Sequence, residues 1–217
     1  TNAATTYSKT NTGASNVTLT ADDGTWSIAA VALDTDLGLN IKYAGNLTVT
    51  GISTETNAST TYSKTNTGAS NVTLTADDGT WSVETGALNT DLNNNFKYAG
   101  GLTVTGIAED DEATALTAYT TAKTGATTNT LTATNNNWSV AVSTLDTALA
   151  AGVQFTGDLT VTSVSDETAA LADYTKGKTG ADKNTLIADG VWSVAASTLD
   201  TALAGKVRLT GDLTVTD

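Results

Sequence analysis

A run of four acidic residues, Glu109-Asp110-Asp111-Glu112, is the strongest concentration of potentially reactive side chains in this sequence. Carboxylate oxygens are the ligands that Ca²⁺ prefers, so residues 109–112 are a candidate calcium site. The alternative interpretation is a solvated charge run at a junction or at the start of a helix. Asp166-Glu167 stands at the next junction, whereas Ser53-Thr54-Glu55-Thr56 carries far less charge. A calcium site here would therefore not be common to the whole chain.

The composition excludes several catalytic centres. The 217 residues include no histidine and no cysteine. Histidine is the commonest general base and transition-metal ligand, and cysteine supplies thiolates and disulfides. Ser-His, Cys-His and His-zinc centres are therefore ruled out. Two carboxylates could still act as acid and base, but no acidic residue lies in an unusually apolar stretch. We therefore predict that the protein is not an enzyme.

The charge of the chain limits its partners. Ten Lys and Arg stand against 23 Asp and Glu, which gives a formal net charge of −13. This balance argues against binding nucleic acid or an anionic membrane surface. No apolar run reaches membrane-spanning length, so we expect no membrane insertion. The absence of a signal peptide and of an initiator methionine suggests a processed chain or a piece of a longer one.

The sequence repeats itself four times. Tyrosines recur at 7, 62, 119 and 174, and each repeat closes on an LTVT segment. Repetition at a fixed period is typical of arrays in which neighbouring units share a buried core. We therefore divide the chain into repeats 1–55, 56–111, 112–167 and 168–217, which we expect to pack against neighbouring repeats.

Within a repeat, apolar residues alternate with threonine in the pattern of a half-buried strand, as in Val17-Thr18-Leu19. The segments Ala-Asp-Asp-Gly, Asn135-Asn136-Asn137 and Asp189-Gly190 predict tight turns with a left-handed residue, and hence β-hairpins, with a type I′ turn at Asp189-Gly190. Residues 143–153 predict one or two helical turns, with Ser143 and Asp146 resembling a capping box. One tryptophan follows each turn, and we expect these four side chains to form the structural core: Trp26, Trp81, Trp138 and Trp192.

Together these patterns predict an all-β protein of four antiparallel repeats of about 55 residues. A unit of this size with one tryptophan has a marginal core, so neighbouring repeats should share buried surface. Two architectures remain open, namely Ig-like sandwich modules and a β-solenoid-like stack. In either case the repeats should follow one another in an elongated array.

The segment ADDGTWSVETGAL at 76–88 resembles the bacterial Ig-like repeats of giant secreted surface adhesins. The resemblance implies an extracellular stalk of antiparallel sandwiches, often with calcium at the module junctions. Ig-like domains usually need about 100 residues. A repeat of about 55 residues would thus be a shortened module, half of a sandwich, or part of a solenoid with similar hairpins.

These observations lead to a functional hypothesis: an extracellular structural region, the spacer or stalk of a bacterial surface adhesin. The first alternative is a subunit of a self-assembling fibre or surface layer, and the second is a glycan-binding module. The expected partners are neighbouring repeats or further copies of the chain placed end to end. A glycan or host surface would be bound through domains outside this sequence. No cofactor is predicted apart from calcium.

Overall fold

The structure is a computed structural model that describes residues 6–7, 9–54 and 57–217. Helices account for 36% of it and strands for 43%, and the paired strands form parallel sheets. The prediction of an all-β, antiparallel, Ig-like fold is therefore wrong, and the fold is α/β. The physical reason is the connection length. A parallel pair needs a crossover of a dozen or more residues, and here Val17 lies opposite Ile41 and Asn46 opposite Asn71.

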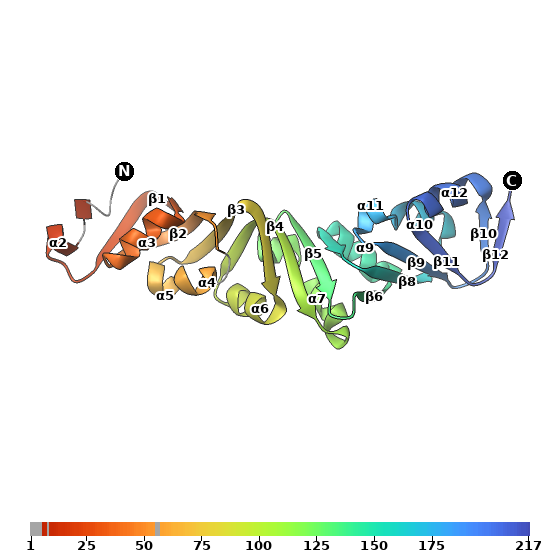
Figure 1. The fold of residues 1–217 in the computed structure, drawn as a ribbon, viewed down its shortest axis with the longest axis horizontal. Helices are drawn as coiled ribbons and strands as arrows, with labels where there is room; N and C mark the ends of the chain where they lie inside the picture. The colour runs from red at the N-terminus through yellow and green to blue at the C-terminus, as the bar shows by residue number, and fades with distance from the viewer. Residues whose placement is uncertain (1–5, 8, 55–56) are drawn as a thin grey trace. The chain divides into compact units, whose positions relative to one another are not determined.

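The chain divides into two compact units. The first comprises residues 1–82, 86–102 and 123–127, and its strands are hydrogen-bonded in the order β1-β2-β3-β4. Figure 1 shows its elements, of which β3 and β4 end in the second unit: α2 (Lys9–Thr12), β1 (Val17–Ala29), α3 (Ala30–Gly38), β2 (Ile41–Ile52), α4 (Ala58–Thr61), α5 (Lys64–Thr67), β3 (Asn71–Glu84), α6 (Thr85–Asn93) and β4 (Phe96–Ile107).

The second unit comprises residues 83–85, 103–122 and 128–217. It contains a four-stranded parallel sheet in the order β11-β9-β8-β6 and the parallel pairs β5–β7 and β10–β12. Its elements are η1 (Glu109–Asp111), α7 (Glu112–Ala118), α8 (Thr121–Thr124, shared with the first unit), β5 (Thr128–Ala133), β6 (Asn137–Ala141), α9 (Val142–Ala150), β7 (Val153–Phe155), β8 (Asp158–Val164), α10 (Glu167–Asp173), α11 (Lys176–Thr179), β9 (Lys183–Ala188), β10 (Trp192–Ala195), α12 (Ala196–Ala204), β11 (Val207–Thr210) and β12 (Leu213–Thr216).

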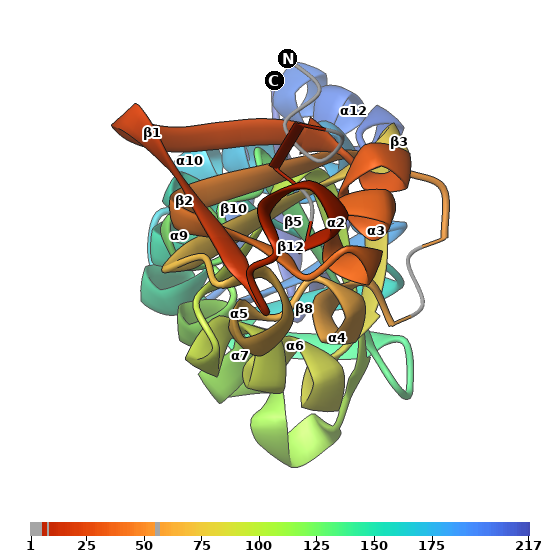
Figure 2. The same ribbon diagram turned by 90° about the vertical axis from the view of Figure 1, so that its left-hand side faces the viewer.

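Two kinds of helical crossover alternate along the chain. A nine-residue helix joins the two strands of each repeat, as α3 joins β1 to β2 and lies against β2 (Figure 2). The helical turns predicted at 143–153 are confirmed by α9, but the capping box is not. Helix α9 begins at Val142 with Ala141 at its N-cap, so Ser143 lies inside the first turn. A pair of short helices such as α4 and α5 then leads to the next repeat.

The predicted β-hairpins are wrong. In the first repeat the turn segment is a bulge within β1, and in the third and fourth repeats the segments before and after the turn, β5 and β6 or β9 and β10, pair with other strands. Strand β1 keeps its direction through the Asp-Asp-Gly segment, because it pairs in parallel with β2 on both sides of the register shift between Thr20 and Thr25. The predicted left-handed conformation is confirmed at Gly24 (φ 70°) and Asn136 (φ 55°). Gly190, in contrast, does not have a positive φ, so the predicted type I′ turn is absent there.

Each tryptophan lies on the strand that precedes the nine-residue helix of its repeat. Trp81, Trp138 and Trp192 are at most 2% exposed, whereas Trp26 is half-buried on the first strand. Three of the indoles donate a hydrogen bond from Nε1 to a backbone oxygen eighteen residues later, at Ala44, Thr156 and Thr210. Each of these tryptophans therefore ties the two strands of its own repeat together.

In the part of the chain that the structure describes, no helix has the length and apolar character needed to span a membrane.

Candidate functional site

The most elaborate arrangement of polar side chains in this protein is the junction between consecutive repeats. The second strand of one repeat pairs with the first strand of the next, as Leu47 lies opposite Val72 in one unit and Leu159 opposite Asn184 in the other. We use the word junction for this strand pair together with the short helices beside it. Because the same geometry occurs in both units, it is a property of the repeat.

A tyrosine of the following repeat hydrogen-bonds to an aspartate of the preceding helix at each of these two junctions. The Tyr174 hydroxyl donates to Oδ1 of Asp146 at 2.7 Å, and Tyr62 hydrogen-bonds to the Asp34 carboxylate in the same way. Burial and the adjacent carboxylate raise the pKa of Tyr62 to about 12, and they also raise the pKa of Tyr174. Both tyrosines are at most 5% exposed, so each phenol fills the junction and fixes the carboxylate.

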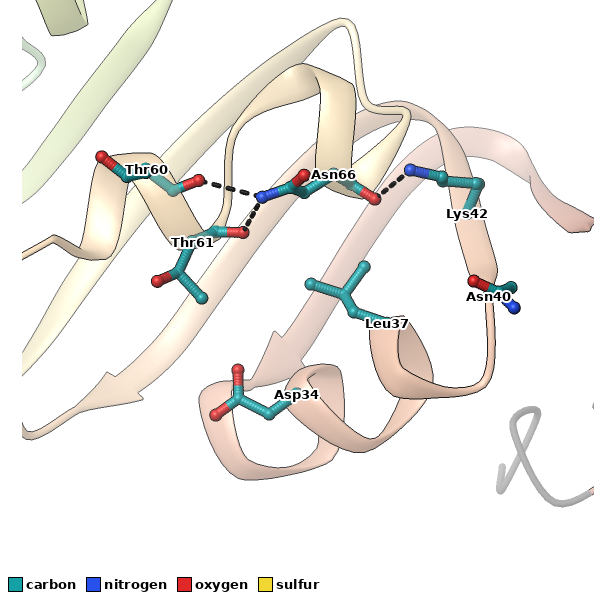
Figure 3. A pocket seen from close by; sticks show the side chains of 7 residues that line it. All are labelled: Asp34, Leu37, Asn40, Lys42, Thr60, Thr61 and Asn66. Carbon is teal, nitrogen blue, oxygen red and sulfur yellow. Dashed lines mark hydrogen bonds between the residues drawn. The ribbon is translucent and has the colours of Figure 1, made fainter.

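At the first junction, a lysine and an asparagine side chain donate hydrogen bonds to backbone carbonyl oxygens of the short helices. Lys42 Nζ on β2 donates to the carbonyl oxygens of Thr65 and Asn66 in α5, and Figure 3 shows the bond to Asn66. The Asn66 side chain donates in turn to the carbonyl oxygens of Thr60 and Thr61 at 3.0 Å. An open pocket of about 540 Å³ is lined by Lys42, Thr60, Thr61 and Asn66 together with Asp34, Leu37 and Asn40. Several polar groups of this pocket are hydrogen-bonded to each other, and these bonds connect one repeat to the next.

A second tyrosine–aspartate pair lies inside the first two repeats. The hydroxyl of Tyr43 donates to Asp36, and that of Tyr98 donates to Asp91. The third and fourth repeats replace both partners together, with Ala148 and Phe155 in one, and Ala202 and Leu209 in the other. The ring still packs edge-on against the tryptophan in the third repeat, at 5.0 Å between the centroids of Trp138 and Phe155. The core thus accepts either the hydrogen-bonded pair or the apolar pair.

This exchange gives a testable prediction. Tyr43→Phe should lower the free energy of unfolding by about 1–3 kcal/mol, because it leaves the buried Asp36 carboxyl without its donor. Adding Asp36→Ala, which reproduces the pair of the third repeat, should recover most of this loss. A double-mutant cycle with denaturant unfolding measures both effects. Equal and additive losses would show that the two side chains do not depend on each other.

Alkaline pH provides a second prediction. The folded state holds the Tyr62 proton up to about pH 12, whereas an unfolded tyrosine releases its proton near pH 10. The stabilisation is therefore complete below about pH 10 and is lost as the pH rises to about 12, because the unfolded state then binds fewer protons. Unfolding free energies measured across this range should fall, and Tyr62→Phe should make the fall shallower. An unchanged slope in that variant would contradict the assignment.

The structure places the acidic run at the start of a helix. Glu109–Asp111 form the short helix η1, and Glu112 begins α7. Glu112 is 8% exposed and accepts a hydrogen bond from the Ser139 amide at 3.4 Å, while burial raises the pKa of its carboxyl. Glu109, Asp110 and Glu112 line an open pocket of about 480 Å³, and Asp111 does not. Over residues 6–7, 9–54 and 57–217, no group of three or more side chains is placed to hold a metal ion.

Calcium binding at residues 109–112 stays a prediction of the sequence. A melting curve with millimolar calcium and with a chelator tests it, because a ligand that binds only the folded state raises the melting temperature. If calcium binds there, replacing Asp110 and Asp111 by Asn should abolish the rise.

Comparison with family models, with curated proteins and with solved structures gave no match. Sequence reasoning used the four tyrosines only to align the repeats and missed their role at the junction. A signal was present, since Tyr62 follows Asp34, and Tyr174 follows Asp146, by the same 28 residues.

Proposed function

We propose that this chain is a structural repeat region, in which each repeat docks on the next through the tyrosine–aspartate junction. The observation that carries the proposal is that the polar side chains form hydrogen bonds between strands and between repeats. Tyr62, Tyr174 and Lys42 form hydrogen bonds that hold one repeat to the next. The Nε1 groups of Trp26, Trp138 and Trp192 form hydrogen bonds that hold the two strands of a repeat together. A catalytic or binding site is needed once in a chain, whereas these contacts recur.

A spacer is the role that these properties support best. A repeat that buries its surface mainly against its neighbours adds length without adding a new kind of contact. The net charge of −13 suits a solvated region that does not bind nucleic acid. We include in the proposal the extracellular location and the place within a surface adhesin. Their support is the repeated, threonine-rich composition and not the Ig-like resemblance, because the parallel α/β fold contradicts that architecture.

A deletion tests the structural role. Removing one whole period, the second repeat at residues 56–111, joins the first repeat to the third and should leave a folded chain with a cooperative melt. Removing residues 56–83 instead deletes almost all of strand β3 but keeps its neighbour β4, and it should destabilise the chain strongly. A full-period deletion that fails to fold would show that the repeats are not interchangeable structural units.

A glycan-array screen with the native chain separates a spacer from a glycan-binding module. A spacer should give no specific signal above that of an acidic control protein. Asn135 lines the same pocket as Glu109 and Glu112. Saturable binding to one glycan class that is lost on substitution of Asn135 would replace the structural proposal with that of a glycan-binding module.

A further inference from the structure

The last repeat exposes apolar side chains that the other repeats bury. Leu159 and Val161 on β8 are fully buried, whereas the equivalent Leu213 and Val215 on β12 are 41% and 51% exposed. The difference follows from strand pairing. Strand β8 has β6 on one side and β9 on the other, but β12 pairs only with β10 among the described strands. The fourth repeat therefore exposes one half of a junction. We call this surface, which includes Leu213 and Val215 on β12, the C-face.

The first repeat exposes the complementary half of the same junction. Tyr7 is 50% exposed, although the equivalent Tyr62 and Tyr174 are at most 5% exposed. Thr12 is likewise exposed, while its equivalent Thr67 is fully buried. Among the described strands, β1 is an edge strand of its sheet, with β2 as its neighbour. We call this surface, which comprises Tyr7, α2 and the start of β1, the N-face.

We propose that the C-face binds the N-face of a second copy of this chain, in the geometry of the internal junctions. This inference rests on the proposed structural function and names its partner. The contacts can be transferred residue by residue. The pairs Leu47–Val72 and Val49–Leu74 on β2 and β3 become Leu213–Val17 and Val215–Leu19 between copies.

Backbone and polar contacts extend the match. The carbonyl oxygen of Gly45 accepts from the Ser70 amide at 2.7 Å, and that of Gly157 accepts from the Asp182 amide at 2.7 Å. Gly211 and Ser15 stand at these positions on the C-face and N-face. Asp200 is the equivalent of Asp34 and Asp146, and it is exposed where the hydroxyl of the second copy's Tyr7 would lie.

One basic side chain also lies in the expected place. Arg208 on β11 is exposed and is the equivalent of Lys42, which binds the carbonyl oxygens of Thr65 and Asn66 in α5. The helix α2 repeats the α5 sequence Lys-Thr-Asn-Thr, so Thr10 and Asn11 would supply the same oxygens. A net charge of −13 on each copy opposes contact at low salt, and salt screens this repulsion. Association should therefore strengthen as ionic strength rises.

Sedimentation velocity over a range of chain concentrations and salt tests the proposal. The native chain should form larger species as its concentration rises, because a head-to-tail contact leaves a free face at each end. Val215→Asp on the C-face and Tyr7→Asp on the N-face should each weaken association by about tenfold or more, since each buries a charge at a central contact. Val31→Asp is the matched control, because Val31 is 79% exposed on α3, outside both faces.

Mixing the two variants gives the sharpest test. Each should sediment as a monomer alone, but each retains the face that the other lacks, so an equimolar mixture should form dimers and nothing larger. A native chain that stays monomeric at all concentrations and salts overturns the proposal, as does equal weakening by Val31→Asp. These outcomes leave the structural function standing, because that function is tested by the deletion and the glycan array.

Discussion

Trp138→Ala should lower the free energy of unfolding by about 3–5 kcal/mol, the usual cost of truncating a buried aromatic side chain. The indole is 2% exposed, packs edge-on against Phe155, and donates from Nε1 to the Thr156 carbonyl oxygen at 3.2 Å. The substitution therefore removes packing on both strands of the repeat and leaves a carbonyl oxygen without its donor. Denaturant unfolding followed by circular dichroism measures the change.

Trp26→Ala is the matched control for this prediction. Trp26 makes the same edge-on contact, with Tyr43 at 5.0 Å, and the same hydrogen bond to a strand oxygen, but it is only half-buried. Its loss should cost about 1–2 kcal/mol, since less apolar surface returns to water. A loss below about 1 kcal/mol for Trp138→Ala would mean that this tryptophan does not hold the repeat together.

Gly157→Ala should have an effect of similar size through the backbone. A Cβ on Gly157 would lie 2.2 Å from the carbonyl oxygen of Asn136, and φ is +81°. That oxygen also accepts the Asp158 amide at 2.9 Å, so the bulge cannot move away without losing a hydrogen bond. We expect a loss of about 3–5 kcal/mol from overpacking, the left-handed conformation and the broken bond together.

The fourth repeat supplies the control for this substitution. Gly211 is the equivalent glycine and has φ +106°, but a Cβ there would meet no atom within 4 Å. Gly211→Ala should therefore cost only the conformational strain, about 1–2 kcal/mol. Thermal or denaturant melts of the two variants separate the close approach from the strain. Equal losses would show that the Asn136 oxygen does not set the requirement for glycine.

The direction of the neighbouring strands could not be predicted from local sequence patterns. Alternation of Val17, Thr18 and Leu19 identifies a half-buried strand, but it does not tell which way the neighbouring strand runs. Asp-Asp-Gly followed by a second strand is equally typical of a hairpin and of a bulge. The deciding feature is the single Gly45 opposite that segment, where a Cβ would meet the Gly24 oxygen at 2.3 Å. This partner lies 21 residues away and is invisible to local patterns.

The short helices between repeats could not be predicted because of their length and composition. Helices α4 and α5 have four residues each, rich in Thr, Ser and Asn, and such residues have low helix propensity. They depend on local bonds, such as the Ser63 side chain accepting from the Asn66 amide. The left-handed conformations of Gly24 and Asn136 could be predicted, because they depend on residue type at a fixed position.

The placement of one tryptophan in each repeat gives this chain four built-in optical probes. Trp26 is half-buried, and Trp192 is fully buried with its Nε1 bonded to the Thr210 oxygen. Trp81 is also buried, but its Nε1 has no hydrogen-bond partner. Indole emission responds to polarity and hydrogen bonding, so the probes should emit at different wavelengths. The emission spectrum of the native chain during unfolding would therefore report whether the repeats lose their structure together or one after another.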